Sequence, residues 1–186
     1  MSHPTTLPAE PRLIRAAPRE EAGDLVAFLC AHEWPYHVVP QPTAAEAERW
    51  IQAGRFESRS DRSLWVVRGD ERVGLVALHD LEDPTPVFDL RLGASVRGLG
   101  LGRRVLGLVA RYVFVELGRH RVEGHTRADN VGMRRAFRAA GWVKEAHYRS
   151  AWPGATGGWH DAITYALLEA DWRAGRTTPV PWGDEP

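Results

Sequence analysis

The clearest chemical signal in this sequence is a glycine-rich turn, Arg97-Gly98-Leu99-Gly100-Leu101-Gly102, between a predicted strand and a predicted helix. The first backbone amides of a helix have no partner inside the helix, and the helix dipole favours negative charge there. Glycines allow the backbone to approach a phosphate closely, while Arg97, Arg103 and Arg104 add positive charge. The turn is therefore predicted to bind a pyrophosphate.

Two other phosphate motifs and a purely structural turn are the alternatives. The dinucleotide fingerprint GxGxxG needs a glycine where Arg103 stands, and an acidic residue at the end of a second strand about twenty residues later. A Walker loop would end in Gly-Lys followed by Ser or Thr, which is missing here. A turn that only joins a strand to a helix explains one or two glycines, so three glycines with Arg97 favour the binding site.

Hydrophobic periodicity predicts strands and helices around this turn in an order typical of an α/β fold. We expect one domain with a mixed, largely antiparallel central sheet of about seven strands and four flanking helices. The helices are expected at about 18–29, 43–51, 101–118 and 129–140, and the strands at 13–14, 64–68, 73–78, 87–92, 121–126, 143–148 and 161–167.

Length and charge narrow the class of protein. The 186 residues suit one domain, expected at 11–174, between loose tails at 1–10 and 175–186. The 24 basic and 24 acidic residues cancel, which argues against a nucleic-acid or anionic-membrane partner. Cys30 is the only cysteine, and neither a leader nor a membrane-spanning run is visible, so a cytoplasmic protein without disulfide or metal site is predicted.

Three spaced motifs together resemble the GNAT acetyltransferase superfamily. The glycine turn is similar to its R/Q-x-x-G-x-G/A signature, and Asp129-Asn130 with Ala140-Gly141-Trp142 resembles its second conserved stretch. The segment from Trp159 to Trp172 resembles the ribosomal-protein N-acetyltransferase-like (RimJ/RimL-like) branch. The resemblance covers residues 87–172 by motif, and the N-terminal half by the order of its elements.

The resemblance implies an acetyl-CoA cofactor and a single GNAT-type domain. It implies that amides of the turn hold the pyrophosphate, and that the pantetheine arm lies between the fourth and fifth strands. Asn130 would contact the pantetheine, although a helix cap is an equally common role for such an asparagine. The expected coenzyme-binding residues are Leu92, Gly93, Ala94, Val96, Arg97, Gly98, Leu99, Gly100, Leu101, Gly102, Arg103, Asn130 and Arg134.

The implied reaction is direct transfer of an acetyl group from the thioester to a primary amine. A backbone amide near 92–94 would stabilise the oxyanion, and a base must take a proton from the ammonium. Phe137 and Met133 stand where the family often has a tyrosine and a serine, so no acid is assigned beyond water or Tyr148. Asp89 would lie at the cleft or pair with Arg91 on the same strand face. The candidate bases are Asp89, Glu33, His37, His79 and His125.

The acceptor would enter between two aromatic loops, at 32–37 and 152–160. Their rings and a carboxylate favour a cationic amine, unless the tryptophans only anchor the loops. The amine belongs to a small molecule or a peptide N-terminus, and a non-catalytic acyl-CoA sensor is the alternative function. A homodimer is an open possibility. The expected substrate residues are Trp34, Tyr36, His37, Tyr148 and Trp159.

Overall fold

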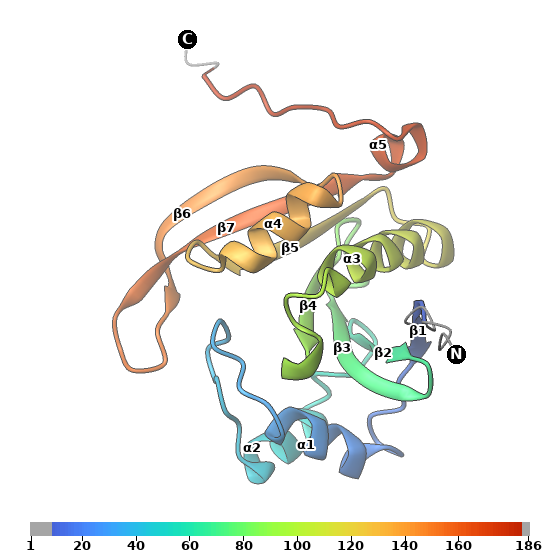
Figure 1. Ribbon diagram of the computed structural model, residues 1–186, viewed down its shortest axis with the longest axis vertical. Helices are drawn as coiled ribbons and strands as arrows, with labels where there is room; N and C mark the ends of the chain where they lie inside the picture. Colours follow the sequence, from blue (N-terminus) through green and yellow to red (C-terminus); the bar gives the residue numbers. More distant parts are fainter. Residues whose placement is uncertain (1–8, 184–186) are drawn as a thin grey trace, which may run out of the picture.

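The computed structural model describes residues 9–183 as an α/β fold (Figure 1). The elements in chain order are β1 (Pro11–Arg15), α1 (Ala22–Cys30), α2 (Ala44–Gln52), β2 (Arg62–Arg68), β3 (Glu71–His79), β4 (Val87–Leu92), the 3-10 turn η1 (Ala94–Val96), α3 (Leu101–Arg111), the π-helical turn η2 (Tyr112–Glu116), β5 (Arg121–Arg127), α4 (Val131–Ala139), β6 (Val143–Pro153), β7 (Trp159–Leu168) and α5 (Glu169–Ala174).

The predicted architecture is confirmed. Seven strands form one mixed sheet in the order β1-β2-β3-β4-β5-β7-β6, in which β4 and β5 are parallel and the other neighbours are antiparallel. The short helix α5 was not predicted, and α1 begins at Ala22 rather than at Pro18. Residues 9–10 and 175–183 of the expected tails contain no helix or strand, and the remaining tail residues lie outside the described part.

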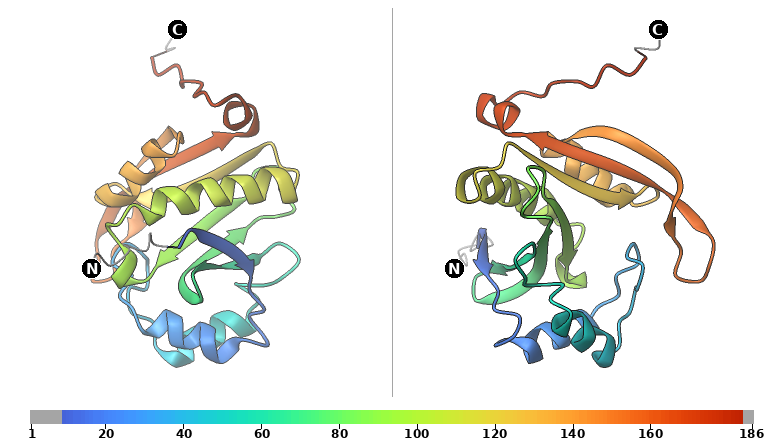
Figure 2. Two further views of the ribbon diagram at one scale, coloured as in Figure 1. Left: turned by 45° about the vertical axis from the view of Figure 1, so that its right-hand side comes forward. Right: turned by 180° about the vertical axis from the view of Figure 1, so that it is seen from behind.

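Two hydrophobic clusters cover the two faces of the sheet. On one face, α3 and α4 pack through residues such as Val105, Val109 and Phe137. On the other face, α1 and α2 pack through Leu29 and Ile51 against Trp65, Leu75 and Ala77 of β2 and β3. Figure 2 shows the α1–α2 connection leaving that second layer and rising toward the β6–β7 hairpin.

The parallel pair at the centre of the sheet is very short. β4 and β5 pair only at Val87 with Glu123 and at Phe88 with Gly124. Beyond these pairs β4 continues along β3 and β5 continues along β7, so the two halves of the sheet diverge. The sheet therefore opens between β4 and β5 on the carboxyl side of the parallel pair.

Gly124 at the start of the divergence is expected to tolerate no side chain. A Cβ there would lie 2.6 Å from Cζ of Phe137 and 2.7 Å from Cε1 of Phe88, both in the core. We predict that Gly124→Ala lowers the free energy of unfolding by about 1–3 kcal/mol because the rings must shift. Gly107→Ala is the control: it lies on the exposed side of α3 with open space around it and should stabilise by about 0.5–1 kcal/mol. Urea unfolding measures both, and equal stabilities would contradict the close packing.

Candidate active site

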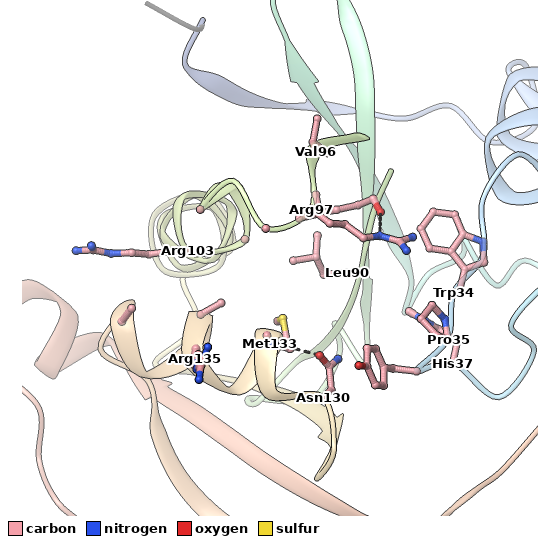
Figure 3. Close-up of a pocket in the computed structure, with 18 residues that line it drawn as sticks. Trp34, Pro35, His37, Leu90, Val96, Arg97, Arg103, Asn130, Met133 and Arg135 are labelled. Carbon is pink, nitrogen blue, oxygen red and sulfur yellow. Dashed lines mark hydrogen bonds between the residues drawn. The ribbon is translucent and has the colours of Figure 1, made fainter. Parts of the chain in front are cut away.

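A cavity of about 600 Å³ opens where β4 and β5 diverge (Figure 3). We call it the α4-side cavity. Its walls come from four places: the end of β4, the glycine turn, one face of α4 and the loop between α1 and α2. The lining residues are Trp34, Pro35, Tyr36, His37, Leu90, Leu92, Val96, Arg97, Gly98, Gly100, Gly102, Arg103, Asn130, Gly132, Met133, Arg135, Ala136 and Ala139.

The glycine turn presents free backbone at the mouth of this cavity. Gly98 and Gly100 adopt left-handed φ values of 74° and 78°, and a Cβ on either would meet no atom within 4 Å. The helix α3 follows at Leu101 and has no side-chain cap at its N-terminus. Its first amides are therefore available to an anion, as the sequence pattern indicates.

The edge of β4 supplies a second set of free backbone groups. Gly93 donates its amide to the Val73 carbonyl of β3 at 2.9 Å. Hydrogen bonds alternate along an antiparallel ladder, so the backbone groups of Leu90 and Leu92 face the gap toward β5 instead. Arg97 Nε donates to the Leu92 carbonyl at 2.7 Å. The amide of Leu92, and the amide and carbonyl of Leu90, are left to pair with an extended ligand.

The structure separates the expected coenzyme-binding residues into two groups. Leu92, Val96, Arg97, Gly98, Gly100, Gly102, Arg103 and Asn130 line the α4-side cavity. Gly93, Ala94, Leu99, Leu101 and Arg134 do not line it.

Contacts of the arginine side chains within the protein account for part of the difference between the two groups. Arg134 Nη1 donates to the Ala128 carbonyl at 2.7 Å, whereas its neighbour Arg135, which the sequence analysis missed, lines the cavity. Arg97 Nη2 donates to the Glu33 carbonyl at 2.6 Å, and its guanidinium lies 5.2 Å from the Trp34 ring centroid. In Figure 3 the Arg97 guanidinium points toward Trp34. Arg97 therefore anchors the α1–α2 loop in this structure.

Asn130 caps α4, as one of its two expected roles required. Its side-chain oxygen accepts a hydrogen bond from the Met133 amide at 3.1 Å, and Asn130 also lines the cavity. Among the described residues that line this cavity, Tyr36 carries the only hydroxyl group.

A second cavity, of about 480 Å³, lies on the α1–α2 face of the sheet. We call it the α2-side cavity. His37 is the residue that lines both cavities, so its imidazole stands where they meet. The lining residues are His37, Val38, Val39, Trp50, Arg55, His79, Val87, Phe88, Asp89, Arg91, His125 and Trp152.

A chain of polar contacts holds His37 at this junction. Its Nε2 lies 2.8 Å from Oδ1 of Asp89, and Arg91 Nε donates to Oδ2 of the same carboxylate at 3.1 Å. The Nδ1 atom of His37 is buried and has no hydrogen-bond partner among residues 9–183. The tautomer with the proton on Nε2 donates to Asp89, which leaves a buried lone pair on Nδ1.

Asp89 is a poor candidate for the base. Burial acts to raise the pKa of its carboxyl group, but the charges of His37 and Arg91 and the hydrogen bond from His37 outweigh that effect. The pKa of Asp89 therefore lies far below its ordinary value of 3.8. A carboxylate with a depressed pKa is a weak base, and its contact with Nε2 suits it instead to orient His37.

None of the other expected catalytic residues lines both cavities. His79 Nδ1 pairs with Asp61 at 2.6 Å and His125 Nε2 with Glu123 at 3.3 Å, both on the α2-side cavity only. Glu33 is exposed and lines neither cavity.

The aromatic residues that the sequence suggested for the substrate fall into two groups. Tyr148 and Trp159 line neither cavity and are 50% and 66% exposed. The rings of Trp34 and Tyr36 already face guanidinium groups of the protein, Arg91 and Arg97 at Trp34 and Arg127 at Tyr36. In this structure the protein's own arginines therefore occupy positions over these two rings, where the sequence suggested a cationic amine.

The loop that carries His37 is held at both ends and in its middle. Trp34 is buried, its Nε1 donates to the Leu29 carbonyl at 2.8 Å, and its amide donates to the Pro40 carbonyl at 2.7 Å. Arg127, at the end of β5, donates to the Pro35 carbonyl at 3.2 Å. These contacts join the loop to the diverging half of the sheet, so His37 is placed by the tertiary structure.

Two negative findings apply to residues 9–183. They contain no group of three or more His, Cys, Asp or Glu side chains that is arranged to hold a metal ion. None of the helices formed by this part of the chain combines the length and apolar character that crossing a membrane requires.

Comparison with protein families places residues 12–143, more than half of the chain, in the family described as "Acetyltransferase (GNAT) domain". The sequence comparison with curated proteins finds no match. Among solved structures, the fold is similar to a spermidine N-acetyltransferase SpeG chimera from Vibrio cholerae and hSSAT. The two are 16% identical with a TM-score of 0.74, over 89% of this chain and 99% of that chain.

Two further Vibrio cholerae structures are similar, each with 17% identity and a TM-score of 0.71. One is spermidine/spermine N-acetyltransferase SpeG with manganese ions, matched over 89% of this chain and 96% of that chain. The other is a dodecameric spermidine N-acetyltransferase, matched over 88% and 96%. At such low identity these likenesses establish the fold.

The contacts of Asp89 with His37 and Arg91 should contribute to the stability of the folded protein. We predict that Asp89→Asn lowers the free energy of unfolding at pH 7 by about 2–4 kcal/mol, because the buried guanidinium of Arg91 loses its carboxylate and His37 loses the same partly buried partner. The folded-state pKa of Asp89 is depressed, so its stabilising effect is complete above pH 3.8 and is lost as the pH falls below that value. The wild type should therefore lose stability faster than the variant below about pH 4.

Urea unfolding at pH 7, 4 and 3 measures this difference. Asp70→Asn, in the exposed β2–β3 turn, is the control and should change stability by less than about 0.5 kcal/mol. Parallel pH profiles for the wild type and Asp89→Asn would contradict the proposed ion-pair chain.

Proposed function

This chain belongs to the GNAT acetyltransferase family, and we propose that it transfers the acetyl group to a primary amine at the junction of its two cavities. In this proposal the α4-side cavity holds acetyl-CoA, the α2-side cavity holds the amine, and His37 is the base between them. The observation that carries the proposal is that His37 lines both cavities while Asp89 holds its Nε2.

The residues of the α4-side cavity fit coenzyme A, the acyl donor that the family uses. The open backbone at Gly98 and Gly100 and the uncapped start of α3 suit a pyrophosphate. The free edge of β4 at Leu90 and Leu92 suits an extended arm with amide groups, which would pair with it as an added strand does. Arg103 and Arg135 line the same cavity and supply positive charge for the phosphates.

The chain's own groups account for the proton movements. Bound acetyl-CoA supplies a thioester whose carbonyl carbon accepts the amine. The imidazole of His37 takes one proton from the ammonium, and Asp89 stabilises the imidazolium that results. The Leu92 amide faces the gap and can donate to the carbonyl oxygen as negative charge develops, whereas the Gly93 amide is already bonded to Val73.

No side-chain acid is required for the last step. The N–C bond of the product amide forms and the C–S bond of the thioester breaks. Of the two protons that the nitrogen loses, one leaves through His37 to solvent and the other ends on the sulfur. A thiol has an ordinary pKa of about 8.5, so its thiolate is an adequate leaving group near neutral pH. Phe137, at the position where the family often has a tyrosine, is fully buried and stacks on Tyr165.

Several finer expectations remain part of this proposal. They are the domain bounds 11–174, a cytoplasmic location and membership of the RimJ/RimL-like branch. A homodimer is also proposed; the similar spermidine N-acetyltransferase structure from Vibrio cholerae is dodecameric.

The coenzyme site is tested by Gly100→Asp. A carboxylate there would repel the phosphates, and aspartate tolerates a positive φ better than most residues. We expect the dissociation constant for CoA, measured by calorimetry, to rise at least about 100-fold with little change in folding. Gly118→Asp is the matched control, since Gly118 also has a positive φ and open space but does not line the cavity. Unchanged CoA affinity in Gly100→Asp would show that the phosphates bind elsewhere.

The base is tested by His37→Gln. Thiol release from acetyl-CoA is first measured across a panel of primary amines, and the best acceptor is used for the variant. We expect kcat to fall about 100- to 1,000-fold, with CoA affinity unchanged, because the ammonium keeps its proton. The lost rate should return partly at high pH, where more of the amine is free. His120→Gln, an exposed histidine outside both cavities, should keep wild-type kcat. A panel without any acceptor, or full activity of His37→Gln, would refute the proposal.

A further inference from the structure

The α2-side cavity has an unbalanced set of charged groups. Its lining includes two guanidinium groups, Arg55 and Arg91, and one carboxylate, Asp89. We infer that the acceptor carries an oxyanion in addition to its amine, and that Arg55 and Arg91 bind this oxyanion. The inference rests on the proposed function and specifies the class of amine.

Arg91 is the buried part of this site. Its side chain is only 4% exposed, its Nε donates to Asp89, and its guanidinium lies 5.4 Å from the Trp34 ring centroid. Its Nη1 is buried and has no hydrogen-bond partner among the described residues. A buried guanidinium with an unpartnered donor is costly, so an anion in the cavity that Arg91 lines would be favoured by its charge.

Arg55 is the accessible part of the site, at its rim. The Arg55 guanidinium lies 5.0 Å from the Trp50 ring centroid, and no ion pair or hydrogen bond to its side chain occurs among residues 9–183. It lines the same cavity as Arg91. Burial lowers the pKa of the Arg91 guanidinium, Asp89 opposes this effect, and the charge of Arg55 lowers the pKa further. Two like charges held near one another favour an anion between them.

The carboxylates around the cavity are already matched. Asp89 accepts from both His37 and Arg91, Asp61 pairs with His79, and Glu123 pairs with His125 and Arg121. A polycation in this cavity would have no unpaired carboxylate among these three to bind, and the two guanidinium groups would repel it. The spermidine of the fold relatives is therefore a poor match to this cavity.

The arrangement also limits the size of the acceptor. Asp89 contacts both His37 and Arg91, so the residues proposed to receive the amine and the oxyanion are neighbours of one carboxylate, which favours a small acceptor. Val38, Val39, Trp50 and Trp152 add apolar wall to the same cavity. An amino acid with an apolar or aromatic side chain satisfies the three requirements: an amine, a nearby carboxylate and an apolar group.

The test measures binding, which needs no turnover. N-acetylphenylalanine and N-acetylphenylalaninamide differ only in the carboxylate, and calorimetry on the full chain, with and without CoA, compares their affinities. We expect the carboxylate to bind at least about tenfold more tightly than the amide. Arg55→Met should remove most of this difference. Arg49→Met, an exposed arginine of α2 outside both cavities, makes the same charge change and should preserve it.

Kinetics provide the second readout. Phenylalanine should have a KM at least about tenfold below that of phenylalaninamide, and Arg55→Met should raise the KM of phenylalanine alone. A phosphonate analogue that performs as well as phenylalanine would support a general oxyanion site. Equal affinities for carboxylate and amide, or preferential turnover of spermidine, would overturn this inference while leaving the proposed function intact. Failure of the wild type to bind CoA would instead contradict both this inference and the proposed function.

Discussion

The architecture depends on one constraint, the short parallel pairing between β4 and β5. After Phe88 and Gly124 each strand keeps its antiparallel neighbour and loses its parallel one, so the sheet opens. The opening leaves backbone groups of Leu90 and Leu92 without a ladder partner, and unpaired backbone is costly unless a ligand or water satisfies it. The glycine turn lies at the end of the same strand, so a free strand edge and a free helix N-terminus face one cavity.

The α1–α2 loop converts this opening into two cavities that meet. Three side chains join it to the sheet: Arg97 after β4, Arg127 at the end of β5, and Asp89 through His37. The cation–π contacts at Trp34 and Tyr36 mean that aromatic residues of the loop receive the protein's own arginines. These contacts hold the loop that carries His37, and directed proton transfer by the proposed base requires such a held side chain.

The two faces of β4 have different chemistry because side chains alternate along a strand. Leu90 and Leu92 contribute to the α4-side cavity, while Asp89 and Arg91 contribute to the α2-side cavity. One short strand thus supplies apolar surface and free backbone to the proposed donor side, and charge to the proposed acceptor side. Fold relatives can share the first arrangement and still differ in the second, because the charge of Arg55 comes from the segment after α2 and not from the sheet.

Local sequence determined the sheet and the major helices, the glycine turn and the helix-capping Asn130, because periodicity and capping act between residues close along the chain. It also placed Asp89 and Arg91 on one strand face. Only the tertiary structure decided that His37 joins the two cavities, that Arg135 rather than Arg134 lines the α4-side cavity, and that Arg97 holds the loop. Those outcomes depend on contacts between residues separated by tens of positions, such as His37 with Asp89, for which hydrophobic period carries no signal.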